Sequence, residues 1–186
     1  YEQGNVSLNG IYTTTQGGAV SVAGNTALAG NTTIATGSGA VTFSGTVDGA
    51  PNATPALSVN TSGATTFVRA VGSLNPLASL TTAGGGATAT SSVSTTGSQT
   101  YSGAASLNGP YWVYDAGSAF TVAGATTLVG PVSVNACGAA EGHERKCPDT
   151  GASITFNGTV DSLANKGFSL TVVAGATGDV TFNLSL

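Results

Sequence analysis

The chain repeats its own sequence, and this internal repetition limits its fold more than any other feature. Three landmark segments recur in the same order: SLNG at residues 7–10 and 106–109, VSVAGNTALAG at 20–30 with FTVAGATTLVG at 120–130, and VTFSGTVDG at 41–49 with ITFNGTVDS at 154–162. The offset is 99 and then 100 residues for the first two landmarks, and 113 for the third. The sequence therefore predicts one elongated unit over residues 1–186, made of two related copies at about 5–67 and 105–182 with a middle segment at 68–104.

A stretch of fourteen residues, CGAAEGHERKCPDT at 137–150, accounts for the increase in offset. It holds both cysteines and the only histidine, and copy one has no counterpart to it. Because copy one is complete without this loop, we interpret the loop as an insertion. We expect Cys137 and Cys147 to form a disulfide, which adds about 2–3 kcal/mol in the chain-entropy model. The alternatives are free thiols or a metal site, whose ligands would be Cys137, His143, Cys147 and either Glu141 or Glu144; zinc ligands usually stand closer together in sequence.

Runs of four to eight residues that alternate apolar with Thr, Ser or Asn occur along the whole chain. In VTFS at 41–44, Val41 and Phe43 share one face while Thr42 and Ser44 share the other, which is the period-two pattern of a strand with one buried face. The 28 glycines suit tight turns between such runs. The sequence therefore predicts an all-β protein.

Two all-β architectures can use this pattern. A β-solenoid stacks short parallel strands, and coils of about 20–25 residues would give about eight rungs in a chain of this length. An antiparallel β-sandwich with strand exchange is the alternative. The Gly-bounded short strands and the long-period repeat favour the solenoid, and the middle segment at 68–104 supplies either more rungs or a connection.

Charge and hydropathy exclude several classes of protein. The net charge is −4 with only four cationic residues, which argues against a nucleic-acid partner because such binding depends on neutralising phosphates. A mean hydropathy of +0.23 argues against intrinsic disorder. The sequence has no apolar run of about 20 residues, so we expect no transmembrane segment.

The chain begins with Tyr1 and contains no methionine. We therefore expect a processed chain from which a signal peptide has been removed. A disulfide in the inserted loop would agree with export, because such bonds persist in oxidising compartments. The predicted location is extracellular or at the cell surface.

Four segments carry a resemblance to known proteins: VTFSGTVDG, LSVNTSGATTF, AVGSLNPLASLTT and VSTTGSQTYSGAASLNG. In this order they resemble the repeats of giant bacterial surface proteins of the filamentous-haemagglutinin and autotransporter-adhesin type, and the similarity covers most of the chain from about Val41 onward. The resemblance implies a right-handed parallel β-helix and an exported, non-enzymatic surface structure. The chain departs from this pattern in being short and in carrying the cysteine loop, so it is either a fragment of a larger chain or a small subunit that assembles.

Catalytic motifs are missing from the sequence. Polysaccharide-cleaving solenoids need clustered carboxylates, whereas Asp48 and Asp161 occupy equivalent positions in the two copies and resemble turn residues. The glycine run at 83–87 lacks the Lys-Ser/Thr of a phosphate-binding loop. We therefore expect no enzyme, no cofactor and no resident metal.

The segment YWVYD at 111–115 concentrates aromatic side chains. Strand alternation places Tyr111 with Val113 on one face, and Trp112 with Tyr114 on the other. We interpret Tyr111, Trp112 and Tyr114 as a candidate contact surface for a glycan or a second subunit. Filling of the core is the alternative.

The end of the chain gives the leading hypothesis. The segment VTFNLSL alternates apolar side chains without a charge, and its apolar set (Val180, Phe182, Leu184 and Leu186) forms a candidate assembly edge. We therefore expect a self-assembling subunit of an extracellular filament, fibre or surface layer. An adhesin-type module that recognises a glycan or host surface is the alternative. Ice binding is a minor one, because TTT at Thr13 and TAT at Thr88 do not recur at a fixed sequence period.

Overall fold

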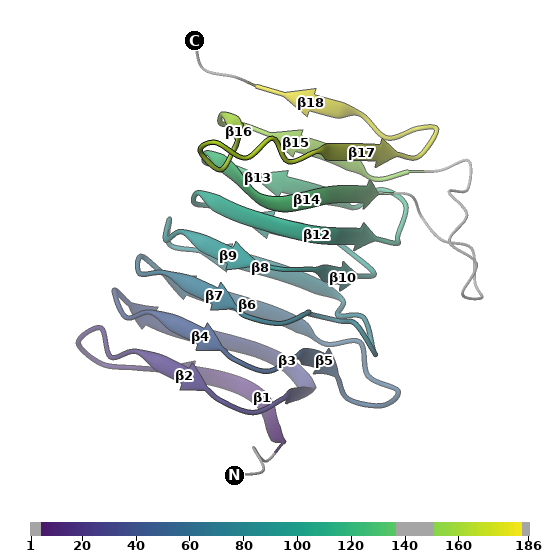
Figure 1. Cartoon of the computed structure of the whole chain (residues 1–186). Coiled ribbons are helices and arrows are strands. Elements are labelled where there is room, and N and C mark those ends of the chain that lie inside the picture. The colour runs from purple at the N-terminus through teal and green to yellow at the C-terminus, as the bar shows by residue number, and fades with distance from the viewer. Residues whose placement is uncertain (1–4, 137–150, 184–186) are drawn as a thin grey trace.

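The computed structural model describes residues 5–136 and 151–183, and over these residues the chain is a parallel β-solenoid of about seven turns (Figure 1). Eighteen strands and no helix are found in the described part, and every strand pair is parallel. The prediction of an all-β solenoid is confirmed. The antiparallel sandwich is wrong, because all the pairs are parallel and join strands of successive turns.

Each turn contributes a strand to three faces, which we number in chain order. Face 1 consists of the first part of β1 (Val6–Thr13), the first part of β3 (Thr26–Gly37), β5 (Val47–Gly49), β10 (Val93–Thr95), the second parts of β12 (Ala105–Val113) and β14 (Thr126–Ala136), and β17 (Leu170–Ala174). Val71 bridges β5 to β10 on this face.

Face 2 has eight stacked strands. They are the second parts of β1 and β3, followed by β6 (Ala56–Thr61), β8 (Ser79–Ala83), β11 (Gln99–Tyr101), β13 (Ala119–Val122), β15 (Ser153–Phe156) and β18 (Val180–Phe182). Face 3 consists of β2 (Val20–Val22), β4 (Val41–Phe43), β7 (Thr65–Phe67), β9 (Thr88–Thr90), the first parts of β12 and β14, and β16 (Val160–Ser162).

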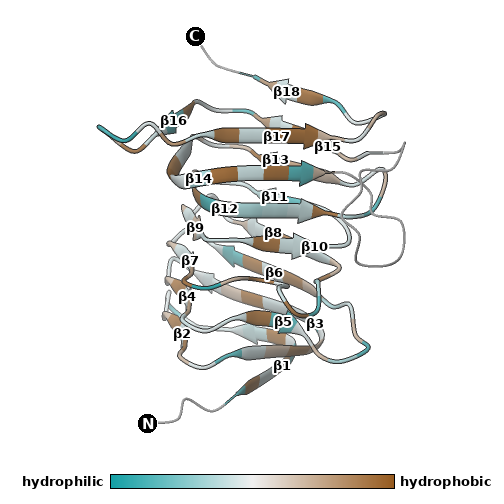
Figure 2. Cartoon of the chain, turned by 45° about the vertical axis from the view of Figure 1, so that its right-hand side comes forward, coloured by the Kyte–Doolittle hydropathy of each residue, from teal (hydrophilic) through white to brown (hydrophobic). Residues whose placement is uncertain are grey.

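The core is a set of columns, in which inward side chains of successive turns lie directly above one another. One column on face 2 contains Tyr12, Ile34, Val59, Thr82, Tyr101, Val122, Phe156 and Phe182. On face 3, Phe43 stacks on Phe67 with ring centroids 5.4 Å apart. The alternation of hydrophobic and polar residues along the strands is visible in Figure 2. Stacking of like side chains explains why such short strands suffice: each turn buries its apolar face against two neighbouring turns.

A column of glycines forms the corner between faces 2 and 3. It contains Gly18, Gly39, Gly63, Gly86, Gly103, Gly124 and Gly158, one for each turn. A Cβ atom at any of the last six would come within 3.0 Å of backbone atoms of the corner below. Only glycine therefore allows the turns to approach closely at this corner.

The two copies lie on different faces. Residues 6–8 of copy one are on face 1, whereas their counterparts 105–107 in copy two are on face 3, four and two-thirds turns later. Equivalent residues nevertheless keep the same local contacts in the two copies. The side-chain amide of Asn9 lies where a Cβ of Gly30 would be, and the side-chain amide of Asn108 lies where a Cβ of Gly130 would be. The repeat is therefore not a whole number of turns, and copy two is rotated by one third of a turn relative to copy one.

The middle segment consists of further rungs and is not a linker. It contributes β8, β9, β10 and β11 to the three faces. These strands cover the end of copy one, where β8 pairs with β6 and β9 with β7. They also lie beneath the start of copy two, where β9 and β10 pair with β12 and β11 pairs with β13.

The inserted stretch at 137–150 begins at the corner between faces 1 and 2, and its own residues lie outside the described part. The backbone N–H of Ala152 donates a hydrogen bond to the Ala136 carbonyl at 2.8 Å, so the chain leaves and re-enters the solenoid at one point. In copy one the corresponding bond runs from Gly39 to Thr36 at 3.2 Å. The solenoid is therefore closed at the base of the insertion.

Candidate functional site

The lower end of the solenoid is an open coil made of β1 and β2. No described strand pairs with the lower edge of either. The inward side chains Leu8, Val20 and Val22 are only partly buried, and Tyr12 is 38% exposed. Above this edge a depression of about 430 Å³ leads into the core; it is lined by Leu8, Ile11, Tyr12, Thr13, Thr14, Val20, Val22 and Ile34. The end of the hydrophobic core is therefore accessible at this coil.

The upper end is a second open coil, made of β16, β17 and β18 (Figure 1). Phe182 stacks on Phe156 below it with ring centroids 5.3 Å apart, and its upper side leaves it 45% exposed. Val180 on the same strand is 44% exposed. These two predicted edge residues therefore lie at an open edge in the described part of the chain, while Leu184 and Leu186 lie outside it.

Tyr12 and its copy-two counterpart Tyr111 show what an open edge lacks. Each hydroxyl lies 3.2 Å from a backbone nitrogen three residues earlier, that of Asn9 and Asn108 respectively. The Tyr111 hydroxyl donates a 2.8 Å hydrogen bond to the Thr90 carbonyl in the turn below, whereas the Tyr12 hydroxyl donates at 3.2 Å to the Asn9 carbonyl of its own strand. Burial raises the pKa of Tyr111 well above its ordinary value of 10.0, because the charged phenolate would lose its hydration.

The aromatic contact surface that the sequence predicted is only partly on the surface. Tyr111 is fully buried in the core, so its assignment to a contact surface is wrong. The alternation itself is confirmed, since Val113 is buried with it. Trp112 and Tyr114 lie on the outer side, partly exposed, with stacked rings 6.2 Å apart and an interplanar angle of 11°. Sequence alternation identified the two sets but could not say which set points inward.

Hydroxyl side chains form an unbroken column on the outside of face 2. It contains Thr33, Ser58, Thr81, Thr100, Thr121, Thr155 and Thr181, on seven successive turns. All seven are partly exposed. The sequence has no Thr-x-Thr motif at a fixed period, and the structure shows a single column of hydroxyls instead: the rungs are regular in space, whereas the corner loops between them vary in length.

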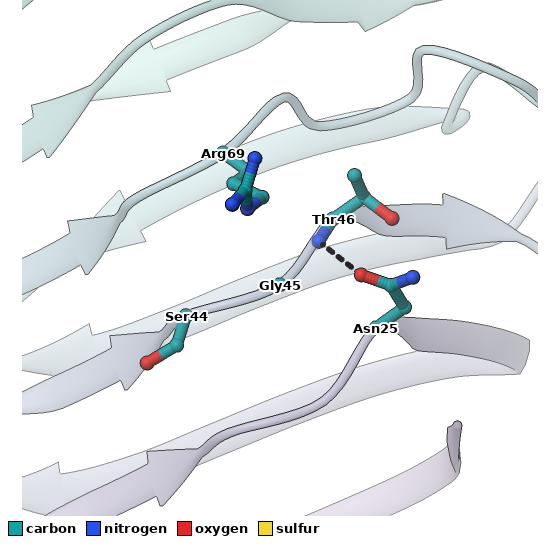
Figure 3. Close-up of a pocket in the computed structure, with 5 residues that line it drawn as sticks. All are labelled: Asn25, Ser44, Gly45, Thr46 and Arg69. Carbon is teal, nitrogen blue, oxygen red and sulfur yellow. Dashed lines mark hydrogen bonds between the residues drawn. The ribbon is translucent and has the colours of Figure 1, made fainter. Parts of the chain in front are cut away.

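Copy one carries a groove at the corner between faces 3 and 1 (Figure 3). It has a volume of about 580 Å³ and is lined by Asn25, Ser44, Gly45, Thr46 and Arg69. The Thr46 backbone N–H donates a hydrogen bond to Asn25 Oδ1 at 3.1 Å. Among the lining residues the charged group is the exposed Arg69. No carboxylate lies among the lining residues, so the groove lacks an acid–base pair.

Asp48 and Asp161 lie in strands β5 and β16, so the interpretation of these residues as turn residues is wrong. Asp48 is 7% exposed and its carboxylate accepts a 2.8 Å hydrogen bond from the Leu74 backbone N–H. A loop over face 1 covers it, which gives it a structural role. Within residues 5–136 and 151–183, no three His, Cys, Asp or Glu side chains gather where they could hold a metal ion.

Several predicted site residues lie outside the described part of the chain. They are Cys137, Glu141, His143, Glu144 and Cys147 of the insertion. The predicted disulfide and its metal-binding alternative therefore stay predictions. No helix long and apolar enough to cross a membrane occurs in the described residues.

Residues 5–136 and 151–183 form a parallel β-solenoid whose two end coils each have an edge that no described strand covers. No family model matches the sequence, and no match is found among curated proteins or solved structures.

Proposed function

We propose that the chain is a structural protein that assembles end to end into an extracellular filament, fibre or surface layer. The observation that supports this most strongly is that one core column opens at both ends of the solenoid. Tyr12 is its lowest member and Phe182 its highest, and both are partly exposed. A strand edge with free N–H and C=O groups beside exposed apolar side chains is a template for a further strand.

The composition supports stable association. Charged residues make up 6% of the chain, so little electrostatic repulsion opposes the contact of one molecule with another. Strands β1, β2, β17 and β18 carry no charged side chain, and the single one in β16, Asp161, is exposed on the outside. The resemblance to repeats of bacterial surface proteins supports the extracellular location.

The direct test places a charge in the open end of the core. Phe182→Asp puts a carboxylate into the contact, whereas Thr181→Asp puts the same charge on the outside of the same strand. We expect Phe182→Asp to abolish filaments seen by electron microscopy and Thr181→Asp to retain them. Filaments that form equally well with Phe182→Asp would contradict end-to-end assembly.

Ice binding is the second candidate function, favoured by the hydroxyl column on face 2. Parallel strands place its members about 4.8 Å apart along the axis. None of these seven side chains makes a hydrogen bond to another described residue. Ice recrystallisation assays on Thr100→Tyr, with Thr127→Tyr on face 3 as the matched control, would test it. Equal behaviour of the two variants and the parent chain would exclude ice binding through this face.

A further inference from the structure

We infer that successive molecules in the assembly are rotated by one third of a turn, so that β1 and β2 of one copy lie on β16, β17 and β18 of the copy below. This inference rests on the proposed end-to-end assembly and specifies its register. The inference is drawn from the internal repeat. In copy two, the strands equivalent to β1 and β2 have further strands beneath them, and these show how the lower edge of the coil is covered.

The covered counterpart of the lower end coil is β12 with β13. The first part of β12 is on face 3, its second part on face 1, and β13 is on face 2. These strands lie on β9, β10 and β11 in that order. The upper end coil offers β16, β17 and β18 on the same faces in the same order, as continuations of the columns to which β9, β10 and β11 belong.

Residue contacts follow from this correspondence. Inside the chain, Leu107 lies above Thr90, and Val122 lies above Tyr101. In the assembly, Leu8 of the upper molecule would lie above Ser162, and Val22 would lie above Phe182.

The Tyr12 hydroxyl, which donates to the Asn9 carbonyl of its own chain, gains an acceptor in the molecule below in this register. Its counterpart Tyr111 lies above Val93 and donates to the Thr90 carbonyl. In the assembly Tyr12 would lie above Val172 and donate to the Ser162 carbonyl, which occupies the place of the Thr90 carbonyl in the same column. The hydroxyl then exchanges its 3.2 Å bond to the Asn9 carbonyl for a bond to the molecule below, and the same contact covers the exposed ring.

Other rotations leave part of the contact open. Without rotation, β1 would lie on β17 and β18, but β2 would stand two rungs above β16, with one empty rung between them. The opposite rotation places only the first part of β1 on a strand, β18, and leaves an empty rung beneath both its second part and β2. Only the one-third rotation found in the internal repeat pairs every described strand of both coils, and each unpaired strand edge would otherwise lose its ladder hydrogen bonds.

Engineered cysteines distinguish the registers. In the inferred register, Thr181 lies beneath Ser21 of the next molecule, as Thr100 lies beneath Thr121 within the chain. Without rotation, Thr181 lies beneath Ile11, the lowest member of its own column. Paired positions on adjacent parallel strands, about 4.8 Å apart, suit a disulfide. The test compares the variants Thr181→Cys/Ser21→Cys and Thr181→Cys/Ile11→Cys, with Thr181→Cys alone as control.

The readout is the ladder of covalent multimers after mild oxidation, with mass spectrometry of the linked peptides to separate the engineered pairs from Cys137 and Cys147. We expect multimers linked through position 21 and not through position 11. Linkage through position 11 in intact filaments would overturn the register while leaving the proposed function in place. A parent chain that forms no filaments would overturn the proposed function, and the register with it.

Discussion

Tyr12 and Tyr111 are the same residue of the repeat in two environments: Tyr12 is 38% exposed at the lower end of the solenoid, whereas Tyr111 is fully buried between two turns. Both keep the contact with the backbone of the preceding SLNG segment. The difference between them lies in the turn below, which β9 and β10 supply for Tyr111. Comparing the two tyrosines therefore measures how much stability an end coil gains when another turn covers it.

Alanine substitutions at the two tyrosines should have unequal effects. Tyr111→Ala leaves a cavity in the core and is expected to lower the free energy of unfolding by about 3–5 kcal/mol. Tyr12→Ala removes a partly exposed ring and is expected to cost about 1 kcal/mol or less in dilute solution. Urea denaturation at low protein concentration measures both. Equal losses would mean that the lower end is covered in the monomer.

A methyl group in the glycine column should destabilise the solenoid. At Gly103 a Cβ would collide with the backbone of Gly85 and Gly86 in the turn below. We expect Gly103→Ala to cost at least about 2 kcal/mol, because backbone atoms cannot move aside as a flexible side chain can. Gly167, where a Cβ meets nothing within 4 Å, is the matched control, and Gly167→Ala should be neutral within about 0.5 kcal/mol. A neutral Gly103→Ala would show that the turns are not in close contact there.

The buried amide of Gln99 should be needed for the core at the copy junction. It is fully buried and donates hydrogen bonds to the Trp112 carbonyl at 2.8 Å and the Thr95 hydroxyl at 3.1 Å. Gln99→Leu keeps similar volume but leaves that carbonyl without this donor, at a cost of about 1–3 kcal/mol. Thr100→Val, on the outer side of the same strand, is the control. Thermal unfolding of both variants measures the difference, and a Gln99→Leu variant as stable as the parent would contradict this role.

Stability should fall at alkaline pH. Burial raises the pKa of Tyr101 and of Tyr111 above 10.0, and for Tyr101 the neighbouring Tyr111 adds to the shift. The unfolded chain releases these protons near pH 10 while the folded chain retains them, so the unfolded state binds fewer protons above that pH. The stabilisation is therefore fully present below about pH 10 and is lost as pH rises, by up to about 1.4 kcal/mol per pH unit for each phenol. Urea denaturation at pH 8 and pH 11 measures the slope, and Tyr111→Phe should reduce it; a flat profile would contradict the burial of these rings.

The insertion should be removable. Replacing residues 137–150 with one glycine gives copy two a corner as short as that of copy one. In copy one, Gly37 and Ser38 connect Thr36 to Gly39, whose N–H donates to the Thr36 carbonyl. Glycine is required because Gly37 has φ +65°. We expect the shortened chain to keep its circular dichroism spectrum and to change its free energy of unfolding by about 2–3 kcal/mol, the contribution expected of a small disulfide. An unfolded product would show that the loop organises the fold.

Alternation along the strands, glycine at the corners and internal repetition were enough to predict the parallel solenoid. They could not show which side of a strand points inward, and this is why Tyr111 was assigned to the surface. The hydroxyl column was missed for a different reason. Its members are separated by 19 to 34 residues, as from Thr81 to Thr100 and from Thr121 to Thr155, because corner loops differ in length while the rungs stay in register. The rotation between copies was equally hidden, since a sequence offset does not state how many turns it spans.

Helical reconstruction of the purified chain by electron cryomicroscopy tests the central claim most directly. With strands about 4.8 Å apart, the account predicts unbranched filaments with an axial rise of about 37 Å per molecule, which corresponds to seven and two-thirds turns. The rotation between neighbours should be close to one third of a turn beyond the intrinsic twist of the solenoid. Discrete monomers, or molecules joined side by side through their faces, would contradict it.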